Sequence, residues 1–385
     1  MKIISLLQPK RLTIGSGCIE QCIEYLQAFV PGKLHVVTSP SQRTTVANIA
    51  SRLTESGCRV TIDDSISSEP TIAMFRSALA AANAAEVDGI LGIGGGSALD
   101  VAKLVAAFSG SKQNVEDCFG IGLLHGRSCH LVCVPTTSGT GSEVSPNAIL
   151  LDEEAKLKKG VVSPYLVPDA TFIDPILTTT MSAAVTASTG LDALTHCIEA
   201  YTNKFAHPLV DVYALQGIES CGRYLVRAVT QPEDLEAREG MSLASFYGGL
   251  CLGPVNTAAV HALAYPLGGE FHLAHGLSNA ILLPHVFHFN AEASPVRHAA
   301  VARALGAKAR ETDLETAYAG AQKLQEMAAA CGVISDLSYH GIAPSSIPGM
   351  ARSAMTVTRL LKNNPREITE TDCAEIYSQC FPSNQ

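Results

Sequence analysis

The chain has 385 residues, of which 47% are hydrophobic and 16% are charged, and its formal net charge is −9. These values are typical of an ordered globular protein and exclude a disordered chain. The acidic balance and the lack of a basic stripe also argue against a nucleic-acid binder. The length allows two domains with a large core.

The N-terminal residues predict neither a signal peptide nor a membrane segment. The apolar patch in MKIISLLQPKRLTIGSG is short, and Gln8 and Pro9 end it before two basic residues. A secretory signal needs a longer apolar region, and polar residues break the longer apolar windows before they reach membrane-spanning length. We therefore expect a cytoplasmic protein.

The first half of the chain alternates two patterns. Short apolar runs typical of strands occupy residues 33–39, 59–63, 88–94, 130–136 and 170–174. Helical patterns separate several of them, notably at 41–57 and 71–86. This alternation predicts a parallel, Rossmann-like sheet with helices on its faces.

The pattern changes after about Pro175. From Ser182 onward helical periodicity dominates, at 182–202, 208–228 and 233–250 and then in shorter segments to residue 380. We therefore predict an α/β domain over residues 1–180 and an all-α domain over residues 181–385.

The twelve cysteines are scattered among apolar residues and form no CxxC pair. This arrangement favours reduced cysteines that act as small hydrophobic side chains. A zinc cluster of thiolates has little support.

The stretch GILGIGGGSALDVAK, residues 89–103, reads as a strand that turns sharply into a helix. Gly94, Gly95 and Gly96 allow a tight turn and the close approach of a ligand. Ser97 is placed to cap the helix, with Asp100 three residues later in a variant of the capping box. Free amides at such a helix start suit a phosphate, although the pattern is not GxGxxG and a turn without a ligand is the alternative.

A second polar loop, PTTSGTGSEVSPN at residues 135–147, follows the strand HLVCVPT. Open α/β sheets bind ligands beyond the carboxyl ends of their strands. One such loop alone reads as an ordinary polar connection. Two of them after two strands of one sheet predict a nucleotide site.

Asp192 and His196 lie four residues apart in GLDALTHCIEAY, so one face of a predicted helix carries both side chains. A cluster of histidines follows downstream and includes His261, His272 and His275. A carboxylate with imidazoles from a second segment would make a set of three nitrogens and one oxygen, which suits Fe²⁺, Zn²⁺ or Mn²⁺.

Six motifs occur in order across nearly the whole chain: GGGSALDVAK, PTTSGTGSEV, GLDALTHCIEAY, HALAYPLGG, HGLSNAILLPH and NNPRE. Together they resemble the iron-dependent (group III) alcohol dehydrogenases, which include lactaldehyde reductases and propanediol dehydrogenases. The resemblance implies a dehydroquinate synthase-like architecture, with an N-terminal nucleotide domain, a C-terminal helical domain and a metal in the cleft between them.

The resemblance also implies roles for individual residues. By motif, the metal ligands are Asp192, His196, His261 and His275. The residues expected to bind the cofactor are Gly95, Gly96, Ser97 and Asp100 at the glycine turn, Thr136 and Thr137 in the second loop, and Ser39, Ser145, Asn147, Lys158 and Leu177 elsewhere.

Two positions depart from the family pattern. Many members have a histidine four residues after the third ligand, where this chain has Tyr265, a weaker base. NAD-preferring members often have an aspartate at the end of the strand that includes VVTS, where this chain has Ser39. Ser39 would not repel a 2′-phosphate, and Arg43 is close enough in sequence to pair with one, so we predict that NADP(H) is accepted.

We therefore predict a metal-dependent, NAD(P)-linked alcohol dehydrogenase or aldehyde reductase in which Fe²⁺, with Zn²⁺ as the alternative, acts as a Lewis acid. Tyr265 and His272 are candidates for moving the proton. Its substrate would be a small alcohol or aldehyde, and the protein would form a homodimer or larger oligomer. The alternatives are a dehydroquinate synthase-like enzyme, a maleylacetate reductase, and a nucleotide-binding protein with a structural metal.

Overall fold

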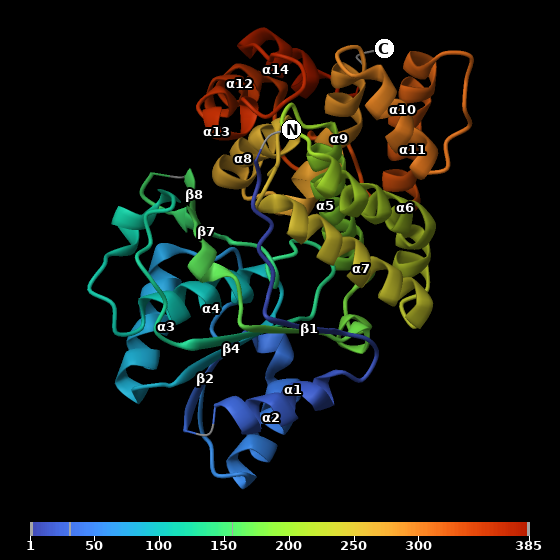
Figure 1. Ribbon diagram of the computed structural model, residues 1–385. Coiled ribbons are helices and arrows are strands. Elements are labelled where there is room, and N and C mark those ends of the chain that lie inside the picture. Colours follow the sequence, from blue (N-terminus) through green and yellow to red (C-terminus); the bar gives the residue numbers. More distant parts are fainter. Residues whose placement is uncertain (1–2, 31, 156, 383–385) are drawn as a thin grey trace. The chain divides into compact units, whose positions relative to one another are not determined.

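The computed structural model describes residues 3–30, 32–155 and 157–382 (Figure 1). The chain divides into two compact units. The α/β unit contains residues 6–137 and 141–179, and the helical unit contains residues 138–140 and 180–382 together with residues 3–5.

Within the described residues, the α/β unit is built on a six-stranded parallel sheet with the order β1-β9-β6-β4-β2-β3. Its strands are β1 (Arg11–Ile14), β2 (Lys33–Thr38), β3 (Arg59–Asp63), β4 (Gly89–Gly94), β6 (His130–Pro135) and β9 (Ala170–Ile173). The predicted Rossmann-like parallel sheet is confirmed. The apolar runs at 33–39, 88–94, 130–136 and 170–174 belong to strands buried on both faces, whereas the run at 59–63 forms the edge strand β3, whose side chains are partly or fully exposed.

Helices cover both faces of this sheet (Figure 1). The pair α1 (Ile19–Phe29) and α2 (Arg43–Glu55) packs with Val36 and Leu91. The pair α3 (Ile72–Ala85) and α4 (Gly96–Phe108) packs with Val37 and Ile90, the neighbouring residues on the same strands. Successive side chains of a strand point to opposite faces, so each strand contributes to two cores.

The sequence did not predict β1, α1 or a smaller sheet formed by β5 (Gly120–Ile121), β7 (Asn147–Asp152) and β8 (Leu157–Val162). β1 is a four-residue edge strand with no fully buried side chain. β7 and β8 pair antiparallel around a charged turn. These strands have too little apolar periodicity to be recognised from sequence.

The helical unit contains ten α-helices within its described residues. They are α5 (Ala183–Thr202), α6 (Pro208–Thr230), α7 (Leu235–Leu252), α8 (Ala259–Phe271), α9 (His275–Ala291), α10 (Pro295–Ala304), α11 (Asp313–Ala330), α12 (Ile347–Met355), α13 (Thr358–Leu361) and α14 (Glu370–Ser378). Ser182, His207 and Asp234 cap the first three, each accepting a backbone N–H bond through its side chain. The predicted series of helices is confirmed.

Helix α5 is the centre of this unit, because every residue from Gly190 to Thr202 is buried. It packs against α6, α7 and α9, so its polar side chains lie inside the protein. All twelve cysteines are buried and free, as their apolar surroundings predicted. Among the described helices, none combines the length and the apolar character needed to cross a bilayer.

Candidate metal centre

Helix α5 presents three ionisable side chains on one face. Asp192, His196 and Glu199 are spaced by four and three residues, so they follow one another along the helix. Their exposed fractions are 3%, 5% and 4%. Buried groups of this kind need partners, and those partners come from two other helices.

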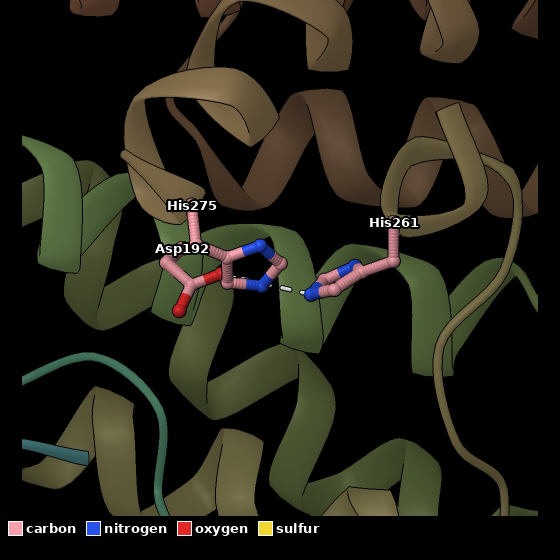
Figure 2. A group of neighbouring side chains, drawn as sticks. All are labelled: Asp192, His261 and His275. Atoms are coloured by element: carbon pink, nitrogen blue, oxygen red, sulfur yellow. Dashed lines mark ion pairs between the residues drawn. The ribbon is translucent and has the colours of Figure 1, made fainter. Parts of the chain in front are cut away.

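Helices α8 and α9 bring His261 and His275 to the same place, and Figure 2 shows both rings directed toward Asp192. The Oδ1 atom of Asp192 lies 3.6 Å from Nε2 of His261, 3.7 Å from Nε2 of His275 and 3.8 Å from Nε2 of His196. Tetrahedral ligand atoms about 2.1 Å from one ion lie about 3.4 Å apart, so this spacing fits a shared ion. Among the described residues, the ligand atoms of Asp192, His261 and His275 all lie within 4.8 Å of one another, whereas His196 approaches Asp192 but lies outside that group.

Glu199 orients His261. One oxygen, Oε2, lies 2.6 Å from Nδ1 of the imidazole, and the other, Oε1, accepts the backbone N–H of Val260 at 2.6 Å. Helix α8 has no side-chain cap at Ala258, so Glu199 also satisfies an N–H group of its first turn. Sequence reasoning missed Glu199, although its position three residues after His196 places it on the same helix face.

Asn279 orients Asp192 in a similar way. It lies one helical turn after His275, is fully buried, and donates from Nδ2 to Oδ1 of Asp192 at 2.7 Å. The same nitrogen lies 3.2 Å from Nε2 of His261 and 3.3 Å from Nε2 of His275. Asn279 was also missed, because only the folded chain shows which buried amide faces the ligands.

The electrostatics of this cluster are those of a cation site. Burial would raise the pKa of Asp192, but the imidazoles of His196, His275 and His261 lower it overall. Burial would lower the pKa of His261, whereas the carboxylates of Glu199 and Asp192 raise it to about 9. Among the described residues, neither carboxylate pairs with a lysine or an arginine. The arrangement thus suits a divalent ion with oxygen and nitrogen ligands.

The glycine turn in the α/β unit connects β4 to α4. Gly94 has a φ of +154°, and a Cβ atom there would lie 2.9 Å from Cβ of Ala98, so the turn requires glycine. The second loop lies beside it, because Thr136 donates its N–H to the carbonyl of Gly94 and a Cβ on Gly95 would lie 3.3 Å from Thr137. The two predicted nucleotide loops are therefore neighbours.

The predicted capping at this turn is wrong. Helix α4 begins at Gly96, its N-cap is Gly95, and no side chain caps it. The carboxylate of Asp100 instead accepts the hydroxyl of Ser142 and, at 2.9 Å, the N–H of Ile149. Helix α4 begins at Gly96, before Ser97, so Ser97 is not at the cap position. The carboxylate of Asp100 binds the loop at 142–149 instead of the helix start.

Lys103 connects α4 to the loop that follows the second nucleotide segment. Its ammonium is fully buried and donates to the carbonyl of Ser142 at 2.9 Å, to the hydroxyls of Ser142 and Ser145 at 3.1 and 3.4 Å, and to the carbonyl of Asn147. Ser145 and Asn147, both implied as cofactor-binding, are thus held in place by one lysine.

Comparison with known proteins assigns the family. Residues 9–175 match the family described as iron-containing alcohol dehydrogenase, and residues 186–381 match the Fe-containing alcohol dehydrogenase family, C-terminal. The chain belongs to the iron-containing alcohol dehydrogenase family. It is therefore an oxidoreductase of the alcohol dehydrogenase class.

Individual relatives of this dehydrogenase align with nearly its whole length. Long-chain-alcohol dehydrogenase 1 of Geobacillus thermodenitrificans is 34% identical, covering 99% of this chain and 98% of its own. NAD-dependent methanol dehydrogenase of Bacillus methanolicus is 30% identical, with coverages of 96% and 97%. The crystal structure of a 1,3-propanediol oxidoreductase superimposes with a TM-score of 0.94 at 32% identity, covering 99% of this chain and all of that one.

The two residues predicted to move a proton differ in their surroundings. In this alcohol dehydrogenase, Tyr265 follows His261 by one turn of α8, is partly buried, and packs against the core of the helical unit. His272 is exposed and ends α8 in a left-handed conformation with a φ of +56°. Tyr265 therefore shares a helix face with a metal-site histidine, whereas His272 has a position typical of a helix C-cap.

The remaining cofactor candidates of this dehydrogenase lie near carboxyl ends of strands or in the smaller sheet. Ser39 follows β2, and its hydroxyl lies 2.8 Å from that of Ser41. Lys158, on β8, forms an ion pair with Glu69. Leu177 is partly buried against the core that α1 and α2 share with the sheet.

Proposed function

We propose that this dehydrogenase catalyses reversible hydride transfer between a small alcohol or aldehyde and NAD(P), with a divalent ion held by Asp192, His196, His261 and His275. The observation that carries the proposal is the set of three imidazole nitrogens within 3.8 Å of one buried carboxylate oxygen. We further propose that residues 1–180 bind the dinucleotide and that residues 181–385 hold the metal and the substrate.

When bound, the ion supplies a Lewis acid for the substrate oxygen and the nicotinamide supplies or accepts the hydride. We propose Fe²⁺ as the ion and Zn²⁺ as the alternative. The protein's contribution is to fix the ligands: Glu199 holds the ring of His261, and Asn279 holds the carboxylate of Asp192. Such partners set the orientation and donor strength of metal ligands.

On the α/β unit, the start of α4 is proposed to bind the pyrophosphate through the partly exposed backbone of Gly95, Gly96 and Ser97. The further residues proposed to line the cofactor site are Ser39, Asp100, Thr136, Thr137, Ser145, Asn147, Lys158 and Leu177. Asp100 and Lys158 take part in contacts within the protein, so their contribution would be to shape the site.

The choice of cofactor is proposed to depend on Ser39 and Arg43. Ser39 brings no charge that would repel a 2′-phosphate. The guanidinium of Arg43 forms an ion pair with Asp64, and both side chains are partly exposed, so the arginine would have to exchange that partner for the phosphate. We therefore propose that NADP(H) is accepted alongside NAD(H).

Tyr265 and His272 are proposed to relay the proton that hydride transfer leaves behind. Tyr265 is favoured by its place on the helix face of His261. Relatives are named for methanol and for long-chain alcohols, so the family does not fix chain length. We propose a small alcohol or aldehyde because Ala, Leu, Gly, Tyr and His predominate near the ligands in the sequence. We further propose that the protein is cytoplasmic and forms a homodimer or a larger homo-oligomer.

The test is a spectrophotometric assay at 340 nm on protein purified without oxygen and loaded separately with Fe²⁺ or Zn²⁺. A panel of short aldehydes is offered with NADH and with NADPH, and metal content is measured on the same samples. Metal-dependent oxidation of both cofactors is expected. Metal-free protein with full activity would overturn the proposal, and an NAD preference above a hundredfold would overturn the role given to Ser39.

A further inference from the structure

The metal centre places two buried carboxylates, Asp192 and Glu199, beside three imidazoles. Asp192 and Glu199 are both at least 96% buried, and the other ionisable groups facing them are the imidazoles of His196, His261 and His275. Among the described residues no lysine or arginine forms an ion pair with either carboxylate. A metal binds imidazoles in their deprotonated form, and in that form the two carboxylates give the cluster two negative charges, which a dication would neutralise.

Glu199 is the second of the two carboxylates. It is not one of the proposed metal ligands. It meets two donors at once, the backbone N–H of Val260 on Oε1 and the Nδ1 atom of His261 on Oε2, each at 2.6 Å. Because an ionised carboxylate only accepts hydrogen bonds, it fixes the proton of His261 on Nδ1. The lone pair of Nε2 is then directed toward Asp192 and His275.

We propose that Glu199 is a positioning residue that makes the centre electroneutral with a dication and sets the tautomer of His261. The inference rests on the proposed function, since it requires the metal site formed by Asp192 and the three histidines. It goes beyond that function because it assigns metal affinity to a residue outside the ligand set. Carboxylates that hold a metal-bound histidine in this way commonly change metal affinity by about 10–100-fold when replaced.

Replacement of Glu199 by glutamine tests this role because it removes the charge and one accepting oxygen while keeping the size of the side chain. An amide has one accepting oxygen, so it can accept from Val260 or from Nδ1 of His261 but not from both. If the amide oxygen stays on Val260, its NH₂ group faces Nδ1 and moves the imidazole proton to Nε2, where it blocks the metal. Size and shape are otherwise unchanged.

The experiment is a titration of metal-free protein with Co²⁺, followed by its visible absorption and by competition with a chromophoric chelator. Wild type, Glu199→Gln and Glu199→Asp are compared with Thr202→Val. Thr202 is buried on the same helix, and within the described part of the chain its hydroxyl bonds to the carbonyl of Ile198 alone, so it controls for the loss of a buried polar group.

Glu199→Gln is expected to weaken Co²⁺ binding about 10–100-fold and to shift the visible bands, because His261 becomes a poorer donor. Thr202→Val should bind like wild type. An affinity of Glu199→Gln within twofold of wild type would overturn the inference while leaving the proposed function intact. Wild type that binds no Co²⁺ would overturn both.

Circular dichroism and gel filtration of each metal-free variant show whether it folds. Should Glu199→Gln fail to fold, Glu199→Asp carries the test, because it keeps the charge and both oxygens but is one methylene shorter. We expect it to bind Co²⁺ about tenfold more weakly than wild type. Unchanged affinity in that variant would overturn the role of the 2.6 Å contacts.

Discussion

Two buried polar clusters in this dehydrogenase differ in how their charges are satisfied. In the α/β unit, Lys103 and Asp100 lie 3.9 Å apart, and Ser142 and the backbone of Ile149 complete their hydrogen bonds. In the helical unit, Asp192 and Glu199 are at least 96% buried, and among the described residues the ionisable groups that face them are imidazoles.

The difference teaches how to separate a structural cluster from a binding centre. Lys103 and Asp100 offset each other, so their cluster needs nothing from outside the chain. Asp192 and Glu199 have imidazoles as their ionisable partners among the described residues, and imidazoles that bind a metal are neutral, so a dication would balance the two carboxylates. The Lys103 cluster is therefore complete within the polypeptide, whereas the Asp192 cluster would be completed by an ion.

The largest effect is expected for His261→Ala. Loss of one ligand should remove the metal and lower kcat/KM about 10³–10⁴-fold, because several kcal/mol of Lewis-acid stabilisation are lost. Metal content and kcat/KM of the purified variant are the measurements.

The matched control is His298→Ala on α10. His298 is buried to a similar degree, but its Nδ1 atom bonds to the carbonyl of Ser294 and its ring packs on Phe287, and no carboxylate among the described residues forms an ion pair with it. It should keep the metal and the activity and lose only stability. A full metal complement in His261→Ala would remove His261 from the ligand set.

In contrast to His261→Ala, Lys103→Met should lower stability and leave the metal content unchanged. It leaves Asp100, whose side chain is 15% exposed, without its cation, so we expect the free energy of unfolding to fall by about 3 kcal/mol, the lower end of the range for a broken buried pair. Urea denaturation of the metal-free protein measures the loss, and metal analysis should find no change. Adding Asp100→Asn to the same chain should restore part of the stability. If Lys103→Met instead lost its metal, the two clusters would not be independent.

A smaller effect is expected from Glu143, whose carboxyl lies near Lys103 and is 2% exposed. Burial raises its pKa to about 7. As the pH rises from 4.5 to 7, the unfolded chain loses this proton before the folded chain does, so the folded state loses about 3 kcal/mol of stability. Above pH 7 the loss is complete.

Glu143→Gln should abolish this loss. Relative to wild type, the variant should have similar stability at pH 4.5 and greater stability at pH 8, measured by urea denaturation of metal-free protein at both values. A stability difference that does not change with pH would show that Glu143 is ionised in the folded state throughout.

Much of the architecture could be predicted from local patterns. The runs at 33–39 and 88–94 are apolar enough to require a sheet buried on both faces, and the step from Asp192 to His196 places both on one side of any helix. The edge strand β1 and the hairpin of β7 and β8 could not be predicted, because their burial depends on neighbours remote in sequence. Ser97 was predicted as a cap because the pattern at 95–100 fits a cap in isolation.

By itself, the sequence determined the two classes of secondary structure, the glycine turn, and the candidate ligands, since each depends on residues within a few positions of one another. Only the tertiary structure decided that Glu199 meets His261, 62 residues later, and that Asn279 faces Asp192, 87 residues earlier. These pairs exist because separate helices pack around α5 and exclude water, and packing over such distances is not encoded in any local pattern.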